Sequence, residues 1–278
     1  MMQLYDDTCF ECSKLITNKY STSFSSGIKA FHEQFRNPIY AIYAFVRYAD
    51  EIVDTFHDYD KATLISDFKT ETFVAIKQKI SLNPVLHSFQ LVVNRYGIDH
   101  DLIDAFLISM EMDLYTQRYD EDGYKAYIYG SAEVVGLMCL RIFCQNDDQV
   151  YQSLLPKACS LGSAFQKINF LRDVKADHEE RGRTYFPNID FNNFTEQDKR
   201  NIELDIKKDF DDALEGIKAL PAGAKLGVYI AYTYYTKLFD KISRTPAGVV
   251  LQQRIRIPDV QKITLYCKAV LRHKFNMI

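Results

Sequence analysis

The chain has 278 residues, of which 47% are hydrophobic, so it can bury a full-sized core. Glycine and proline are few, at 11 and 7 residues, and no stretch reads as a linker, so we expect one domain over residues 1–278. The net charge of −3 and the scattered Lys and Arg side chains argue against the basic stripe of a nucleic-acid-binding protein.

The predicted elements are helices along the whole chain. Apolar residues recur three and four positions apart, as in Ile39, Ile42, Phe45 and Val46, which is the helical period. The strict alternation of a strand is scarce, and its main instance, 254–257, is short. We therefore predict an all-α fold with helices near residues 4–20, 37–56, 60–81, 84–96, 100–118, 122–144, 150–180, 195–217, 221–244 and 258–275. A Ser-rich turn is expected at 21–27, and Pro38 is expected in the first turn of the second helix.

The cysteines and the chain ends suggest a reduced, cytoplasmic protein. Cys9 and Cys12 form a lone Cys-x-x-Cys, and no second pair stands at metal spacing, so we expect no zinc or redox site. The N-terminal segment is acidic and lacks the apolar core of a signal peptide. The longest apolar stretch, 134–140, is much shorter than the roughly 20 residues that span a bilayer.

The second predicted helix carries the first candidate chemistry. Asp50 and Asp54 are four residues apart and share a face with Tyr43 and Arg47, whereas the other faces are apolar. Like charges on a mostly buried helix need compensation, and carboxylate oxygens together with substrate phosphates suit Mg²⁺. Taken alone, this helix fits a solvated acidic edge with Arg47 as a structural partner at least as well.

A later predicted helix carries a second pair of aspartates four residues apart. Asp173 and Asp177 have the same spacing, Arg172 flanks them, and Arg181 and Arg183 follow. The full polar stripe consists of Gln166, Asn169, Asp173 and Asp177. If the two acidic helices face each other, their carboxylates enclose a site for several Mg²⁺ ions, and the arginines can hold diphosphate oxygens in a bidentate manner. The alternative is a pair of interhelical salt bridges.

Such a site would suit the ionisation of an allylic diphosphate. Metal and arginine would stabilise the charge that builds on the leaving diphosphate. The carbocation left behind would need a dry cavity and could be stabilised by aromatic faces. The 19 Tyr and 19 Phe residues could provide such aromatic faces, although core packing is the simpler role for any one of them.

These motifs resemble those of the squalene and phytoene synthases, a family of head-to-head prenyl synthases. The resemblance spans nearly the whole chain and its specificity comes from the combination of segments. The segments are Ser21–Phe24 (Ser-x-Ser-Phe), Tyr43–Asp54 (a first aspartate-rich motif), Tyr127–Gly136 (Tyr-x-Tyr-x-x-Ala-x-x-x-Gly), and Gln166–Asp177 with Arg181–Pro187 (a second aspartate-rich motif and its loop).

The resemblance implies an isoprenoid-synthase-like helical bundle around a central cavity. Mg²⁺, with Mn²⁺ as an alternative, would be held by Asp50, Asp54, Asn169, Asp173 and Asp177. The catalytic set would be the four aspartates and Tyr127, which would line the cavity near the reacting centre. Substrate would be bound by Ser21, Ser23, Tyr43, Arg47, Gln166, Asn169, Arg172, Tyr234 and Arg254. Two departures are Met110–Asp113, where the family often has Gly-Met-x-x-Asp, and Glu133, which stands where a Gly follows Ala.

The reaction implied by the resemblance joins two isoprenyl diphosphates through a cyclopropylcarbinyl diphosphate. We favour phytoene from two geranylgeranyl diphosphates, because 25–28, Ala132 and Gly136 add little bulk where a long tunnel would lie. The alternatives are dehydrosqualene or squalene from two farnesyl diphosphates, and only squalene requires NADPH. A non-catalytic assembly or membrane-docking protein is a further alternative, but it predicts damaged aspartate motifs, and both are intact.

The expected partners follow from the same resemblance. Long apolar substrates and products favour peripheral contact with the inner face of the membrane, because each buried CH₂ contributes about 0.8 kcal/mol. Contact with downstream carotenoid enzymes is also expected, and contact with nucleic acid is not.

Overall fold

The computed structural model describes residues 2–177 and 182–278, and throughout these ranges the regular secondary structure is helical. The prediction of an all-α fold is therefore confirmed. The helices are α1 (Met2–Tyr20), α2 (Thr22–Lys29), α3 (Glu33–Asp54), α4 (Lys61–Gln78), α5 (Pro84–Tyr96), α6 (His100–Tyr115), α7 (Glu121–Ile128), the π-helix η1 (Tyr129–Glu133), α8 (Val134–Cys144), α9 (Asp148–Lys175), the 3₁₀-helix η3 (Phe191–Asn193), α10 (Glu196–Ala219), α11 (Ala222–Ser243), α12 (Ala247–Val250) and α13 (Asp259–Lys274).

Two expectations near the N-terminus are corrected. The Ser-rich segment is helix α2 rather than a turn, because Ser21 serves as its N-cap and accepts a hydrogen bond from the Phe24 amide at 3.1 Å. Helix α3 begins at Glu33, so Pro38 lies in its second turn and not in its first. An acidic residue in the first turn complements the helix dipole, and the His32 amide just before it donates to the Gly223 carbonyl at 2.9 Å.

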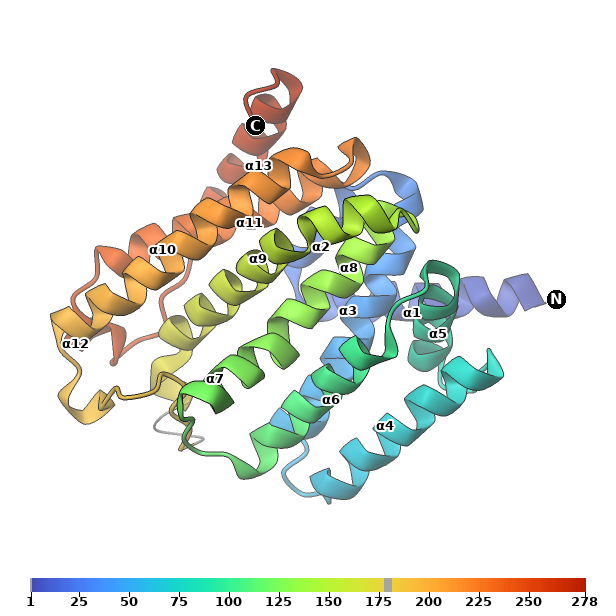
Figure 1. Cartoon of the computed structure of the whole chain (residues 1–278), viewed down its shortest axis with the longest axis horizontal. Helices are drawn as coiled ribbons and strands as arrows, with labels where there is room; N and C mark the ends of the chain where they lie inside the picture. Colours follow the sequence, from blue (N-terminus) through green and yellow to red (C-terminus); the bar gives the residue numbers. More distant parts are fainter. Residues whose placement is uncertain (1, 178–181) are drawn as a thin grey trace.

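The long helix predicted at 122–144 contains a π-turn, η1, between α7 and α8. The π-helix η1 packs between α6 and α9, with the backbones close together. A Cβ on Gly130 would lie 2.6 Å from the Ala105 carbonyl of α6, and a Cβ on Gly162 of α9 would lie 2.9 Å from the Ala132 carbonyl. Figure 1 accordingly shows α6, α7–α8, α9 and α10 side by side.

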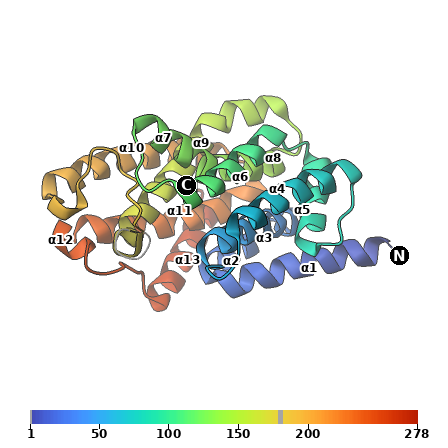
Figure 2. The same ribbon diagram turned by 90° about the horizontal axis from the view of Figure 1, so that it is seen from below.

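The core consists mainly of two apolar clusters. The first lies among α3, α4, α5, α6 and α8, where the rings of Phe45 and Phe89 stack at 3.8 Å between centroids. The second joins the C-terminal half of α9 to α10, α11 and the loop that follows α9, with Phe170 and Ile206 among its members. Figure 2 shows α3 and α11 between the row of α8, α9 and α10 on one side and α1 on the other. The first aspartate pair is thus carried by a helix of the first cluster, and the second pair by a helix of the second.

By length and composition alone, the continuous helical stretch Glu121–Cys144 could cross a membrane. More than half of its apolar window is buried inside the structure, as in a core helix of a globular protein. It packs between α6 and α9.

Candidate active site

Helix α3 carries a polar face that ends in Asp54. The Arg47 guanidinium forms an ion pair with Glu51, lies 3.9 Å from Asp50 and covers the Tyr20 ring at 4.4 Å from its centroid. The Nε atom of Arg47 is buried without a hydrogen-bond partner. One turn earlier, burial raises the pKa of Tyr43, and the nearby Ser21 side chain opposes that rise. A half-buried cation with an unused Nε donor is poised to accept an anionic ligand.

Helix α9 contributes a chain of side-chain hydrogen bonds. The Tyr235 hydroxyl of α11 donates to Asn169 Oδ1 at 3.2 Å, and Asn169 Nδ2 donates to Gln166 Oε1 at 3.3 Å. Gln166 Nε2 in turn reaches the Ser131 hydroxyl of η1 at 3.1 Å. The predicted stripe of α9 is therefore anchored to helices on both sides, which holds Asn169 in one orientation.

Asp173 is held by two arginines. Arg172 donates from Nε to both carboxylate oxygens at 3.1 Å, and Arg254 Nε lies 2.7 Å from Asp173 Oδ1. Arg254 comes from the extended segment between α12 and α13, far away in the sequence. The structure thus brings together three of the predicted site residues at this point.

Arg183 connects the two aspartate motifs. Its Nη1 atom lies 3.3 Å from Asp54 Oδ1 and 3.4 Å from Asp113 Oδ1, and Nη2 donates to the Asp113 carbonyl at 2.6 Å. Its amide donates to the Asp177 carbonyl at 2.7 Å. Because one guanidinium and its own backbone reach both motifs, the acidic ends of α3 and α9 face a common space. Arg181, which was expected beside it, lies outside the described residues.

Asp113 is a buried carboxyl that the sequence reasoning did not assign to the site. It lies in α6 and accepts a hydrogen bond from the Tyr127 hydroxyl at 2.9 Å. Burial raises its pKa to about 7, against the opposing attraction of Arg183, and burial also raises the pKa of Tyr127. Tyr127 therefore stays protonated and donates. The sequence signal that could have revealed Asp113 was the segment Met110–Asp113, which stands where the family often has Gly-Met-x-x-Asp.

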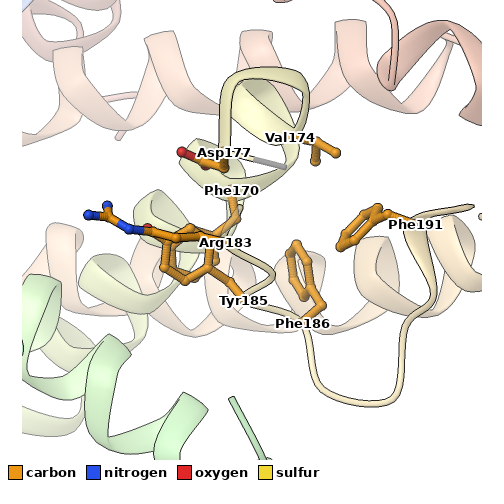
Figure 3. A pocket seen from close by; sticks show the side chains of 7 residues that line it. All are labelled: Phe170, Val174, Asp177, Arg183, Tyr185, Phe186 and Phe191. Carbon is orange, nitrogen blue, oxygen red and sulfur yellow. The ribbon is translucent and has the colours of Figure 1, made fainter. Parts of the chain in front are cut away.

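Aromatic rings form a wall next to these charges. Tyr127 lies 5.2 Å from Tyr185 between ring centroids, and Tyr185 stacks on Phe170 at 4.1 Å. A pocket opens along this wall between the end of α9 and the loop after it (Figure 3). Figure 3 shows Asp177 and Arg183 near one another, with Val174 and Phe191 toward the other side. The full lining is Phe170, Val174, Asp177, Arg183, Tyr185, Phe186 and Phe191. This pocket combines a charged part with apolar and aromatic walls.

The structure places Tyr234 apart from the other candidate site residues. It packs with Ile230 and Ala269 against α13. Its neighbour Tyr235 is the residue that meets Asn169, because consecutive residues on a helix point about 100° apart. Ser23 lies half-buried in the first turn of α2, next to the Ser21 cap.

The small residues proposed to leave space also have packing roles. A Cβ on Gly136 would meet the Ala158 carbonyl of α9 at 3.4 Å, so its small size accommodates a neighbouring helix. A Cβ on Gly27 would lie 3.6 Å from the Gly227 carbonyl of α11, and Ile28 is buried in the first apolar cluster. Glu133, whose direction the sequence left open, turns toward Cys159 of α9, and burial raises its pKa.

The donors present fit a hard divalent cation by chemistry, since they are carboxylates at helical spacing on two facing helices. Among the described residues, no three acidic, His or Cys side chains converge as a ready metal-binding group. The carboxylates are instead paired with arginines, as in the Asp54–Arg183 and Asp173–Arg254 contacts. Arginine side chains already pair with these carboxylates, which is consistent with a site that binds positive charge.

The family model that matches this chain identifies it as a head-to-head prenyl synthase, a transferase of the prenyltransferase type, and the all-helical fold with its two aspartate helices agrees with that class. The chain belongs to the squalene/phytoene synthase family, whose model matches residues 17–261. Two relatives are the phytoene synthase of Arthrospira platensis, 29% identical over 95% of this chain and 93% of the relative, and the 15-cis-phytoene synthase of Synechococcus elongatus, 29% identical over 95% of this chain and 92% of the relative.

Solved structures agree on the fold. A dehydrosqualene synthase in complex with ligand superposes with a TM-score of 0.80 at 19% identity, covering 98% of each chain. A squalene synthase from Alicyclobacillus acidocaldarius gives a TM-score of 0.76 at 19% identity, covering 87% of this chain and 95% of the other.

Proposed function

We propose that this protein is a phytoene synthase that condenses two geranylgeranyl diphosphates head to head and releases diphosphate. The observation that carries the proposal is the similarity along nearly the whole length to two proteins named phytoene synthase, together with intact aspartate motifs. Dehydrosqualene or squalene synthesis from farnesyl diphosphate is the second candidate, because those names belong to the structural neighbours. The whole of residues 1–278 is proposed to act as one catalytic domain.

The arginine contacts support a role in diphosphate binding. In the structure, Arg183 and Arg254 each pair with an aspartate of the motifs, and Arg172 adds a further contact to Asp173. Mg²⁺, with Mn²⁺ as the alternative, would be held by Asp50, Asp54, Asn169, Asp173 and Asp177 and would supply Lewis-acid stabilisation of the leaving diphosphate. Arg172, Arg183 and Arg254 would bind the diphosphate oxygens, for which the guanidinium geometry is suited.

The aromatic wall supports a role in protecting the carbocation. Tyr185 lines the pocket beside its charged part, and Tyr127 packs against Tyr185 at 5.2 Å between ring centroids. An aromatic face attracts a cation by roughly 0.5–2 kcal/mol. Burial raises the pKa of Tyr127, so it keeps its hydroxyl proton and donates it in a hydrogen bond to Asp113, and no phenolate is offered to the cation. The apolar lining by Val174 and Phe191 excludes water that would otherwise quench the intermediate.

The deciding experiment identifies the product. The protein is incubated with Mg²⁺ and with either farnesyl or geranylgeranyl diphosphate, each with and without NADPH, and the hydrocarbon is identified by mass. Phytoene from the C20 substrate without NADPH is expected. Dehydrosqualene or squalene from the C15 substrate, with no product from the C20 substrate, would replace the phytoene assignment, and no hydrocarbon from either would favour the non-catalytic alternative.

Chain length can be tested separately. Ile28→Phe and Ala132→Phe add bulk where the sequence predicted the deep end of a tunnel, and we expect each to lower kcat/KM for the C20 substrate more than for the C15 substrate. If neither variant moves that ratio, these residues do not set chain length. The enzyme is further proposed to work in the cytoplasm at the inner face of the membrane, where downstream carotenoid enzymes would receive its product.

A further inference from the structure

Helix α13 has one packed face and one open face. Tyr266 and Ala269 lie in the cluster that holds α13 against α11, together with Tyr234 and Ile230. The helix otherwise projects from the body of the structure, as Figure 1 shows at the C-terminus. Its open face therefore has no partner among the described residues.

The open face carries a continuous apolar stripe. Val260, Ile263, Leu271 and Phe275 are 78%, 65%, 54% and 67% exposed, and Cys267 between them is exposed too. These positions follow one another at steps of three and four, so they share one side of the helix. Large aliphatic and aromatic side chains lined up in this way are a contiguous exposed patch, which usually marks an interaction surface.

Basic side chains flank the stripe. Lys268, Arg272 and Lys274 are exposed. Residues 259–278 contain four Lys and Arg against one Asp, a formal charge of +3, whereas the whole chain carries −3. Positive charge is thus concentrated on the same element as the exposed apolar stripe.

The combination of an apolar stripe with basic side chains indicates which kind of partner binds the open face of α13. An apolar stripe bordered by Lys and Arg fits the interface of an anionic bilayer, where the stripe enters the acyl boundary and the cations meet headgroups. A second copy of the chain would bring the same basic flank against itself in a two-fold contact, and like charges would oppose that contact. A helix of 16 residues with charged flanks is also too short to span the bilayer.

We propose that α13 docks the protein on anionic lipid through Val260, Ile263, Leu271 and Phe275. This deepens the membrane contact proposed above, but it requires no catalysis. Arg254, which pairs with Asp173, lies only five residues before the helix begins. Docking through α13 therefore brings the charged site close to the surface from which a lipid substrate is drawn.

The test is vesicle flotation without substrate, so that its outcome is independent of the product assay. Wild type is compared on phosphatidylcholine vesicles with and without phosphatidylglycerol, and binding to the anionic vesicles is expected, weakening as salt is raised. The double variant Ile263→Glu/Leu271→Glu is expected to bind roughly tenfold or more weakly. Lys268→Gln and Arg272→Gln are each expected to bind about fivefold more weakly, since one cation near the surface contributes about 1 kcal/mol.

Leu82→Glu is the matched control, because Leu82 is 94% exposed between α4 and α5 and lies outside the stripe. It should bind like wild type, and circular dichroism should show that every variant is folded. Equal binding of wild type and the double variant, or equal binding to both vesicle types, would overturn the proposal. It would equally be overturned if the stripe variants abolished a dimer seen by light scattering without changing vesicle binding.

Discussion

Single residues at the site are arranged so that each acidic side chain has a cation or a proton donor beside it. Asp54 faces Arg183, Asp173 faces Arg254, and Asp113 receives a hydrogen bond from Tyr127. Such pairs cost desolvation energy, and leaving one partner alone costs more. The paired side chains can therefore exchange partners when a ligand binds. Substitutions that remove charge should affect ligand binding before they affect folding.

The first prediction concerns the aspartates. Asp173→Asn retains an oxygen that can accept from Arg172 and Arg254, so the fold should be kept. Loss of the negative charge should lower turnover by several orders of magnitude, because the leaving diphosphate loses its electrostatic stabilisation. Asp50→Asn and treatment with EDTA should act alike. Steady-state diphosphate release measures the effect, with Asp211→Asn on α10 as an exposed control; full activity in metal-free buffer would refute the prediction.

The second prediction concerns pH. Burial raises the pKa of Asp113 to about 7 from an ordinary value of 3.8, so the folded protein keeps a proton that the unfolded chain releases. Stability should therefore fall as pH rises from about 4 to about 7 and then level off. Asp113→Asn should lack this component. Denaturant unfolding in metal-free buffer from pH 4.5 to 7.5 measures it, and parallel curves for the two proteins would contradict it.

Many of the candidate site residues could be predicted from their spacing in the sequence alone. Asp50, Asp54, Asp173 and Asp177 follow helical periodicity within apolar helices, which is local information. Asp113 was missed because its environment is created by α7 and the loop after α9, which are distant in the sequence. Tyr235 could not be told from Tyr234 without knowing which side of α11 packs on α13.

Elements were predicted well where their period and caps are strong. Helix α5 spans Pro84–Tyr96, as expected, with Asn83 as its N-cap and Gly97 at its end. Helix α2 was missed because Ser residues are typical of turns as well as of N-caps. The π-turn η1 leaves no mark in the apolar period, since it results from packing between α6 and α9.

The third prediction tests that packing. In Gly130→Ala, the new Cβ would meet the Ala105 carbonyl at 2.6 Å and the Ser109 side chain at 2.7 Å. Backbone atoms cannot easily yield, so we expect a loss of about 1–3 kcal/mol in the free energy of unfolding. Gly248→Ala is the matched control, because nothing lies within 4 Å of its Cβ position in α12. It should be neutral or slightly stabilising; an equal loss in both variants would show that close packing is not the cause.

The whole molecule is organised around two main apolar clusters, with charged helix ends between them and a smaller third cluster under α13. Asp50 and Asp54 belong to a helix of the first cluster, and Asp173 to a helix of the second. Arg183 is a direct contact across this junction. A ligand that binds both aspartate motifs should therefore stabilise the two clusters as a unit.

The fourth prediction uses pyrophosphate as a ligand that cannot react. Mg²⁺ and pyrophosphate added together should raise the Tm, because a ligand at a hundred times its Kd contributes about 2.7 kcal/mol to stability. Either one alone should have a smaller effect, since the metal is expected to bind together with phosphate oxygens. Differential scanning fluorimetry measures this. The shift should vanish in Asp50→Asn and in Asp173→Asn, and a shift that persists in both would place pyrophosphate elsewhere.

The π-turn has a consequence for how this chain tolerates insertions and deletions. An α-helix advances about 100° per residue, and η1 accommodates one more residue in its turn than α-helix would. The wide turn takes up that residue and so keeps Tyr127, which points at Asp113, in phase with Leu137, which points into the first cluster. Forcing the same residues into regular α would rotate one half by about 100° against the other, whereas deleting one residue from 129–133 would let the helix close into regular α with the two halves nearly in phase. The segment should therefore tolerate the loss of one residue better than the replacement of Gly130, where a Cβ would meet the Ala105 carbonyl at 2.6 Å.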